Sequence, residues 1–196
     1  MLKIDKPLIL ASASPRRQEL LANAGIDFTV LVKPVEEDYP SSLKGAAVAE
    51  FIAQKKAAAY DHEVHNGSIV ITADTIVVVD DLILGKPADA VAATEMLTML
   101  SGRSHEVVTA VCIRVQQLTK SFHVRTKVTF RTLLMSEINH YIEHYRPFDK
   151  AGGYGIQEWI GHVGIVSIDG SYDNVVGLPM AALWSELQAM QKAGSL

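Results

Sequence analysis

Residues 7–17 read Pro7-Leu8-Ile9-Leu10-Ala11-Ser12-Ala13-Ser14-Pro15-Arg16-Arg17. The apolar first half predicts a strand, and a helical segment is expected from Gln18 to Ala24. Pro15 suits the first helical position, because its missing N–H would have no partner there. The free amides of the first helical turn and the positive end of the helix dipole favour an anion. Arg16 and Arg17 add planar guanidinium groups that bind phosphate oxygens in pairs.

This stretch has a second interpretation. Ser12 and Ser14 belong to the residue types that cap helices, so residues 12–17 also fit an ordinary helix N-terminus with solvated arginines. The hexapeptide alone does not decide between a phosphate cradle and a cap.

Outward from this stretch, strand-like runs alternate with helix-like runs, which predicts an α/β fold. An uncharged β-branched run at residues 68–72 predicts a central strand. The other expected elements are a strand at 28–32, a helix at about 43–60, a turn at 61–67, a helix capped by Asp89 and reaching Leu100, and paired antiparallel strands at 107–115 and 122–132. We find no linker or internal repeat, so any lobes are expected to be interleaved within one domain covering residues 1–196.

Composition narrows the class of protein. A chain of 196 residues can bury one core or two small lobes, and its 48% hydrophobic share predicts a globular fold. The net charge of −4 argues against a general nucleic-acid binder. The single cysteine, Cys112, lies in an apolar alternating run and is expected to be a buried hydrophobe in a reducing compartment. Because a signal peptide and an uncharged apolar run of roughly 18 residues are both lacking, we expect a soluble cytoplasmic protein.

Asp74 is the most conspicuous acid. It follows the central apolar run, and α/β sheets place ligands outside the carboxyl ends of their strands. There it could ligate a divalent cation or accept a proton from water, or it could simply cap a turn. The acidic cluster Glu36-Glu37-Asp38 is either a solvated loop or, across a cleft from Asp74, the second part of an all-oxygen Mg²⁺ or Mn²⁺ site.

Two lysines and one glycine-rich tract complete the candidates. Surface solvation is the default expectation for Lys56 and Lys86, although Gly85 and Pro87 hold Lys86 in a defined turn. The tract Ala151-Gly152-Gly153-Tyr154-Gly155-Ile156-Gln157 would let backbone approach a ligand closely, or would be a plain flexible turn. It is neither a Walker loop nor a dinucleotide fingerprint.

Together these pieces resemble the Maf family of nucleoside triphosphate pyrophosphatases over nearly the whole chain. Six segments match in the family's order: residues 8–17, Ala73-Asp74-Thr75-Ile76-Val77, Gly85-Lys86-Pro87, Ser101-Gly102-Arg103-Ser104-His105, Asp149 to Gln157, and Gly170 to Pro179. The ending Tyr154-Gly155-Ile156-Gln157 is similar to the branch that acts on dTTP and UTP. Glu158 departs from that branch, where glycine is expected, and this affects the expected shape of the base pocket.

The resemblance implies an elongated mixed-sheet fold with a deep cleft between two interleaved lobes, like that of inosine-triphosphate pyrophosphatases. It also implies a hydrolase that cleaves between the α- and β-phosphates of dTTP, UTP or modified pyrimidine nucleotides, with a divalent cation (Mg²⁺ or Mn²⁺), in a homodimer. Carried over by motif, Asp74 is the general base or metal-bound acid. Arg16, Thr75 and Gln157 match positions for substrate selection, Ser12, Arg17, Lys56 and Lys86 match polar cleft positions, and Glu37 matches an acidic one.

Two other functions compete with this one. The family's association with septum formation suggests a non-catalytic regulator that binds nucleotide or a division partner. The same hydrolysis acting on a purine triphosphate is the third possibility. Nucleotide binding without hydrolysis would favour the regulator, and unchanged base preference after Gln157→Ala would favour a purine substrate.

Overall fold

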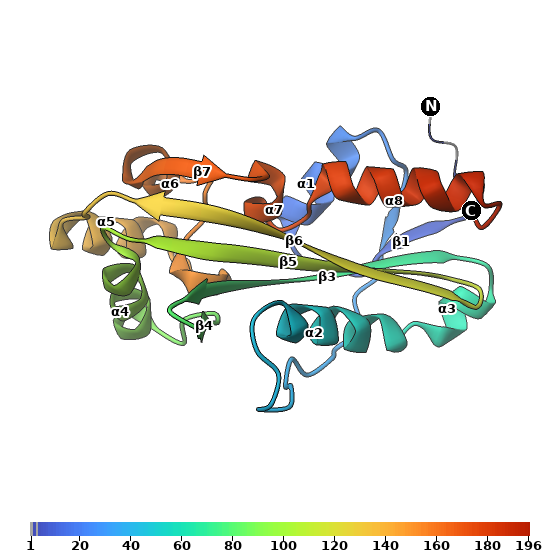
Figure 1. The fold of residues 1–196 in the computed structure, drawn as a ribbon, viewed down its shortest axis with the longest axis horizontal. Coiled ribbons are helices and arrows are strands. Elements are labelled where there is room, and N and C mark those ends of the chain that lie inside the picture. The colour runs from blue at the N-terminus through green and yellow to red at the C-terminus, as the bar shows by residue number, and fades with distance from the viewer. Residues whose placement is uncertain (1, 3) are drawn as a thin grey trace. The chain divides into compact units, whose positions relative to one another are not determined.

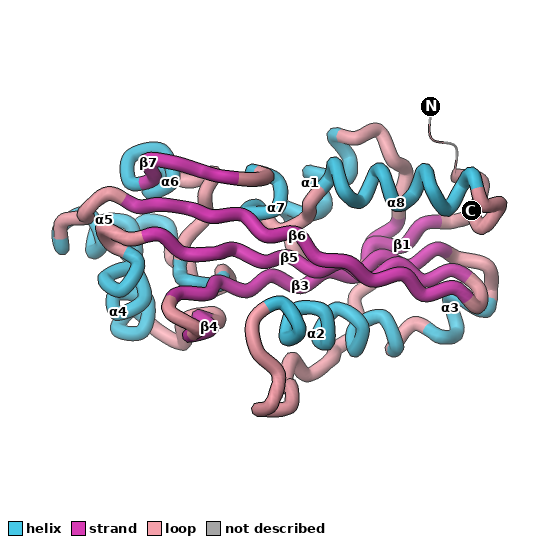
Figure 2. Tube along the Cα trace, viewed as in Figure 1, coloured by secondary structure: helices cyan, strands magenta, loops and turns pink. Residues whose placement is uncertain are grey.

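The computed structural model describes residues 2 and 4–196, and within them the chain forms a seven-stranded mixed sheet (Figures 1 and 2). The strand order is β2-β1-β3-β5-β6-β7, and β4 pairs with β3 off this path. The strands are β1 (Leu8–Leu10), β2 (Thr29–Val30), β3 (Ile69–Val79), β4 (Leu82–Leu84), β5 (Ser104–Val115), β6 (Leu118–Phe130) and β7 (Ile165–Asp169). The predicted α/β class is therefore confirmed.

Helices connect these strands. They are α1 (Pro15–Asn23), α2 (Ala46–Ala58), α3 (Asp61–His65), α4 (Ala90–Leu100), α5 (Met135–Tyr145), α6 (Trp159–Gly164), α7 (Tyr172–Val176) and α8 (Met180–Lys192), with a 3₁₀ turn η1 at Ala151–Gly153. Two predictions at this level are confirmed: Pro15 is the first residue of α1, and the Asp89 side chain accepts from the Ala92 N–H to cap α4. The turn predicted at 61–67 is wrong, because α3 covers most of it.

The chain divides into two compact units with interleaved sequence. The first contains residues up to Asp74, Thr109–Val124 and Gly177–Leu196, and the second contains Thr75–Val108 and Arg125–Val176. Strands β3, β5 and β6 each contribute residues to both units. Each unit is thus assembled from separate segments of the chain, which confirms the predicted interleaving of two lobes.

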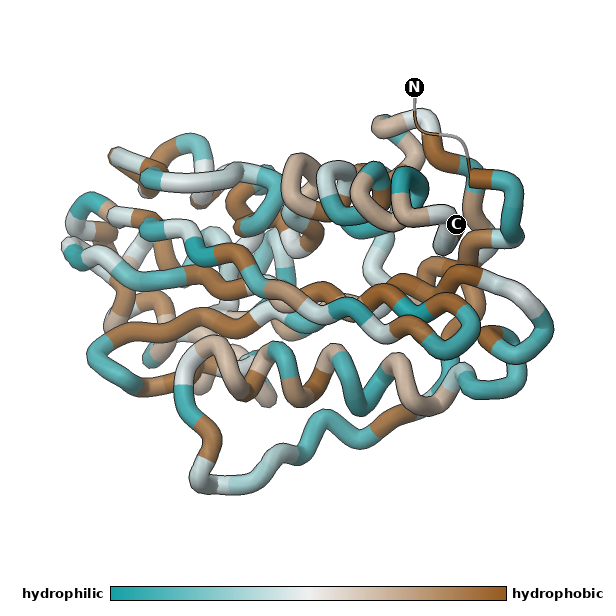
Figure 3. Tube along the Cα trace, turned by 45° about the vertical axis from the view of Figure 1, so that its right-hand side comes forward, coloured by the Kyte–Doolittle hydropathy of each residue, from teal (hydrophilic) through white to brown (hydrophobic). Residues whose placement is uncertain are grey.

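In the first unit, helices cover both faces of the sheet. Leu10 of β1 and Ile71 of β3 share one apolar cluster with Leu21 of α1 and Leu183 of α8. On the opposite face of these strands, Ile9 and Val70 pack with Val64 of α3 and with Tyr60, the residue that precedes this helix. Figure 1 shows α8 and α2 on opposite sides of the strands. Because successive strand residues point to opposite faces, both faces of β1 and β3 must be apolar, and Figure 3 shows that hydrophobic colour follows the strands.

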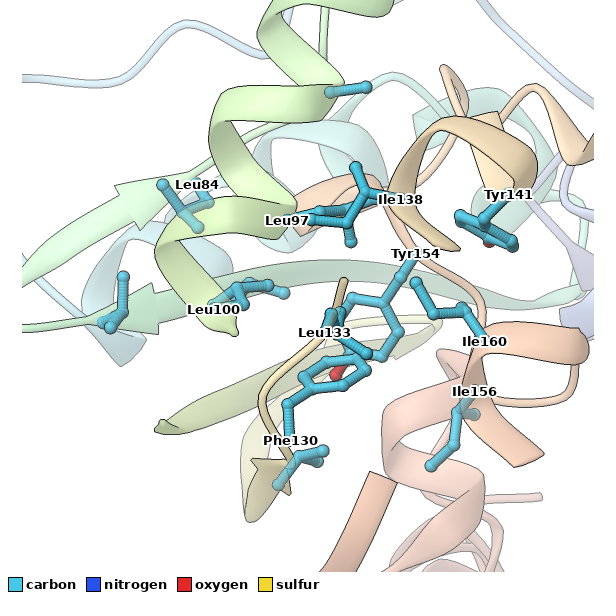
Figure 4. Close-up of a cluster of buried hydrophobic side chains, with 14 of the residues drawn as sticks. Leu84, Leu97, Leu100, Phe130, Leu133, Ile138, Tyr141, Tyr154, Ile156 and Ile160 are labelled. Atoms are coloured by element: carbon cyan, nitrogen blue, oxygen red, sulfur yellow. The ribbon is translucent and has the colours of Figure 1, made fainter. Parts of the chain in front are cut away.

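The second unit has a separate core. Its centre is a cluster of large buried side chains from α4, α5, β6 and the segment that leads into α6 (Figure 4). Phe130 and Tyr154 meet edge to face, with ring centroids 5.1 Å apart. Leu97, Leu100, Ile138 and Ile160 fill the space around them. None of the helices in residues 2 and 4–196 is long and apolar enough to span a membrane.

Gly161 provides a stability test of this second core. A Cβ atom added there would lie 1.8 Å from the Ile156 carbonyl oxygen, so α6 can pack on this backbone only without a side chain. We expect Gly161→Ala to lower the free energy of unfolding by about 1–3 kcal/mol, the usual cost of overpacking, as measured by urea denaturation.

Gly85→Ala is the matched control, because a Cβ atom there meets no described residue within 4 Å. Equal stability losses in the two variants would contradict the packing argument.

Candidate functional site

Asp74 lies inside a strand, not after one. The prediction that it follows the central strand is wrong, since β3 runs from Ile69 to Val79. The strand continues because residues 76–79 are β-branched and Val77 pairs with Leu84 of β4. The neighbouring parallel strand β1 stops earlier, where Leu10 pairs with Ile71. Asp74 therefore lies just beyond the carboxyl end of β1, and its side chain is buried, with the residue only 7% exposed.

Lys56 brings two carboxylates together. Its Nζ lies 2.7 Å from Oδ1 of Asp74 and 2.8 Å from Oε1 of Glu37. The preceding lysine, Lys55, forms an ion pair with Asp38. Two successive lysines of α2 thus attach the acidic loop to the helix. Residues 36–38 are exposed, but the Glu37 carboxylate shares one ammonium group with Asp74.

A buried hydroxyl sets the register of α2 on β3. Thr72 Oγ1 donates to the Ala53 carbonyl at 2.7 Å, and both residues are fully buried. Asp74 is two residues further along β3 and therefore on the same face, and Lys56 is almost one helical turn beyond Ala53. The Thr72 hydrogen bond therefore aligns Lys56 with Asp74.

The turn between β1 and α1 has no side-chain cap. Ser14 is the N-cap residue of α1, but within the described chain its side chain makes no capping hydrogen bond. The Ser14 N–H donates instead to Ser12 Oγ at 3.3 Å. The ordinary-cap interpretation is therefore not supported. The positive end of this nine-residue helix keeps the orientation that favours an anion.

Arg17 supplies a hydrogen bond to the β3 backbone where β1 ends. The Ala11 N–H donates to the Ile71 carbonyl of β3 at 2.9 Å. The Ala73 carbonyl, two residues further along β3, points to the same side. Because β1 has ended there, that strand has no N–H to offer it. Arg17 Nη1 donates to that carbonyl at 3.0 Å, and Nε donates to the Gly177 carbonyl at 2.7 Å. Part of the guanidinium group predicted for phosphate therefore holds the protein's own backbone next to Asp74.

The electrostatics of Arg17 fit this position. Burial lowers the pKa of its guanidinium group from the ordinary value, and the Asp74 and Glu37 carboxylates oppose that shift. Arg16, one residue earlier on α1, lowers the Arg17 pKa further by like-charge repulsion. Two guanidinium groups and two carboxylates of the first unit thus act on one another.

The carboxylates can be tested as metal ligands by their chemistry. Mg²⁺ is usually bound by one or two carboxylates, with substrate phosphates and water supplying the remaining oxygens. Asp74 and Glu37 provide two carboxylates that face one cationic group. In residues 2 and 4–196 no group of three or more His, Cys, Asp and Glu side chains could hold a metal ion. By their chemistry Asp74 and Glu37 fit a hard cation such as Mg²⁺ only if other oxygens complete its coordination.

In the second unit, two predicted segments meet. The Gly152 N–H donates to the Gly85 carbonyl at 3.0 Å, which joins the Gly85-Lys86-Pro87 turn to the glycine-rich tract. A Cβ atom on Gly152, whose φ is +70°, would lie 2.9 Å from Val77 of β3, so the tract must be glycine there. Thr75 lies two residues before Val77, on the same face of β3. Lys86 itself is exposed.

The side-chain oxygen of Gln157 is an acceptor that no donor among the described residues satisfies. Its Oε1 is buried and has no hydrogen-bond partner among the described residues. A buried acceptor left unpaired costs about 1–3 kcal/mol, so a ligand that carries an N–H group would be favoured at this position. Sequence reasoning gave no role to Tyr141, Lys150 or Thr72, although all three make buried or half-buried polar contacts. The Ala53 partner of Thr72, the Gly155 partner of Tyr141 and the Glu158 partner of Lys150 are 8 to 19 residues away in the sequence, so no local pattern indicated these contacts.

An uncharged pair fixes the middle of the tract Ala151–Gln157. His105 Nε2 lies 2.7 Å from the Tyr154 hydroxyl, and the imidazole stacks on Phe130 with ring centroids 5.7 Å apart. Burial lowers the pKa of His105 to about 4 and raises that of Tyr154. Both side chains are therefore neutral at pH 7 and hold the backbone by packing and one hydrogen bond.

Known proteins resemble this chain over most of its length. The sequence profile of a family described as Maf-like protein matches residues 7–190. A Bacteroides thetaiotaomicron protein named dTTP/UTP pyrophosphatase is 47% identical over 95% of this chain and 98% of its own. A Phocaeicola vulgatus protein of the same name is 48% identical over 93% and 95%. A HAM1 protein from Coxiella burnetii has the same fold, with a TM-score of 0.53 over 95% of this chain and 99% of its own, at 12% identity.

His105 makes the stability of the protein depend on pH. The unfolded imidazole binds a proton below about pH 6.5, whereas the folded one binds it only below about pH 4. Its contribution to stability is therefore complete above pH 6.5 and is lost as the pH falls towards 4. We expect the unfolding free energy of the natural chain to fall by about 1 kcal/mol per pH unit more than that of His105→Gln across this window.

Urea denaturation at several pH values measures both slopes, and only their difference is interpreted, since the substitution changes absolute stability. Parallel pH profiles would show that His105 titrates normally in the folded protein.

Proposed function

The chain belongs to the Maf family, and on this premise we propose that it hydrolyses pyrimidine nucleoside triphosphates, dTTP and UTP first among them, to the monophosphate and pyrophosphate. The names of its relatives support this activity. The observation that carries the proposal is the Lys56 ammonium group held between Asp74 and Glu37, beside the Ser12–Arg17 turn. A buried carboxylate, cations and a helix N-terminus in one unit suit phosphoryl chemistry, whereas a binding module has no need of the acids.

The first unit is proposed to bind the triphosphate. The N-terminus of α1, with Ser12 and Arg16 beside it, would take phosphate oxygens. Arg17 would add charge while it holds Ala73 in place. Lys56 would neutralise phosphate charge, which is most of what substitution at phosphorus requires from a protein. Lys86 is assigned to the same substrate by the family resemblance.

Asp74 is proposed as the general base. Its carboxylate would accept the proton of the water that attacks the α-phosphorus, while the bond from that phosphorus to the bridging oxygen breaks and pyrophosphate leaves. The Lys56 ion pair fixes the orientation of this carboxylate. Burial excludes competing water from the carboxylate and strengthens its electrostatic effect.

Asp74 and Glu37 are proposed to hold a divalent cation, Mg²⁺ or Mn²⁺. When bound, such a cation would neutralise the phosphate oxygens and the leaving pyrophosphate. The lysine between the two carboxylates then has a new partner of opposite charge in the substrate.

Gln157 is proposed to recognise the base, and Thr75 to assist in substrate selection. Uracil and thymine present an N3–H donor between two carbonyl acceptors, and the glutamine amide offers both an acceptor and donors. The unpaired Oε1 of Gln157 supports this role, because an N3–H group would satisfy it.

The activity is tested directly on the purified protein. Incubation with dTTP, UTP, CTP and GTP, each with Mg²⁺ or Mn²⁺, should yield pyrophosphate and monophosphate, fastest with dTTP and UTP. Orthophosphate as the sole product would exclude the proposed reaction.

Asp74→Asn should reduce turnover by about a hundredfold or more, because it removes the base and keeps the shape of the side chain. Nucleotide binding, measured by calorimetry, should persist. Asp27→Asn is the matched control, since Asp27 is an exposed acid of the same unit, and it should retain full turnover. Turnover of the Asp74→Asn variant close to that of the control would exclude Asp74 as the base.

A further inference from the structure

A buried ion pair lies next to Gln157 and has no role in the proposed chemistry. Lys150 is only 8% exposed, and its Nζ lies 3.1 Å from Oε1 of Glu158 and 2.7 Å from Oδ1 of Asp149. The Glu158 side chain is 19% exposed. Charges so far from water are costly unless their partners are well placed, so this pair constrains the geometry of the residues around it.

Tyr141 links this pair to the backbone of the tract. Its hydroxyl donates to Oε2 of Glu158 and accepts from the Gly155 N–H at 2.9 Å. Burial and the adjacent Glu158 carboxylate raise the Tyr141 pKa, so the phenol keeps the proton that it donates. Figure 4 shows Tyr141 on α5, at the border of the same core that contains Tyr154 and Ile156. The helix therefore anchors the tract through one hydroxyl group.

Glu158 ends the turn that carries Gln157 and is linked twice to Gly155, where that turn begins. The Glu158 N–H donates to the Gly155 carbonyl at 3.1 Å, and its side chain reaches the Gly155 N–H through Tyr141. A Cβ atom on Gly155 would lie 2.8 Å from Cδ of Glu158 and 3.1 Å from Nε2 of Gln157. The Glu158 carboxylate and the Gln157 amide thus both lie against Gly155. If the carboxylate is displaced, the amide has room to move.

From this geometry we infer that Glu158 is a positioning residue for base selection: the chain Lys150–Glu158–Tyr141–Gly155 holds the Gln157 amide where it can distinguish uracil and thymine from cytosine. Cytosine lacks the N3–H donor and presents an acceptor and an amino group instead. A fixed glutamine acceptor rejects it, whereas a mobile amide could turn and accommodate it. This inference rests on the proposed function, whose base-binding role for Gln157 it deepens.

The test is the ratio of kcat/KM for UTP to kcat/KM for CTP. Glu158→Gln keeps the size of the side chain but replaces one of the two carboxylate oxygens by an NH₂ group. The variant can therefore accept a hydrogen bond from Lys150 or from Tyr141, but not from both. We expect this ratio to fall by about tenfold, the effect of losing one well-placed hydrogen bond to a charged group. Tyr141→Phe should lower the ratio in the same direction, and the double variant should lower it little further. Glu143→Gln, an exposed change on α5, is the matched control and should leave the ratio unchanged.

A ratio separates positioning from general stability, because the fraction of folded enzyme cancels between two substrates. Binding of the non-hydrolysable α,β-imido analogues of UTP and CTP gives the same comparison without turnover. If the natural chain hydrolyses none of the triphosphates, the proposed function fails, and the analogue affinities then decide the inference alone. An unchanged ratio in Glu158→Gln, or equal binding of the two analogues by the natural chain, would overturn it.

Discussion

A carboxylate buried in a β-strand must be paired with a positive charge, and this constraint organises the first unit. Asp74 is 7% exposed within the strand β3, where an isolated negative charge would be strongly disfavoured. Lys56 supplies the pairing charge from the last turn of α2, and the Thr72 hydrogen bond to Ala53 keeps that helix in register. The same ammonium group recruits Glu37 from an otherwise solvated loop. The arrangement gathers charge at one place and gives the buried carboxylate its partner.

The early end of β1 creates the second condition for the site. A parallel strand that stops leaves carbonyls of its neighbour without ladder partners, and buried carbonyls require them. Arg17 substitutes for the missing strand by donating to Ala73, which places a guanidinium group beside Asp74. The arginine is thus part of the backbone hydrogen bonding as well as of the electrostatics. The HAM1 protein shares this fold at 12% identity, so the architecture tolerates very different sequences and the chemistry lies in particular residues.

In the second unit, a glycine-rich tract with few side chains of its own to pack is held in place by other residues. Neutral contacts between His105 and Tyr154 fix its middle. The Lys150–Glu158 ion pair joins the two residues that flank it. A segment with glycines at positions of positive φ loses much conformational entropy on folding, so it needs such external contacts to adopt one conformation.

The sequence by itself determined the α/β class, the helix that begins at Pro15, the Asp89 cap and the residues worth considering at the site, because these depend on local periodicity, capping and motif order. It did not determine that Asp74 lies inside β3, that Lys56 joins Asp74 to Glu37, or that Arg17 serves the backbone. Those features depend on where β1 ends relative to β3 and on which helix face meets the sheet. Tertiary structure alone decided them, because each pairs groups that are far apart in the chain and whose partners are chosen by burial, not by their neighbours in sequence.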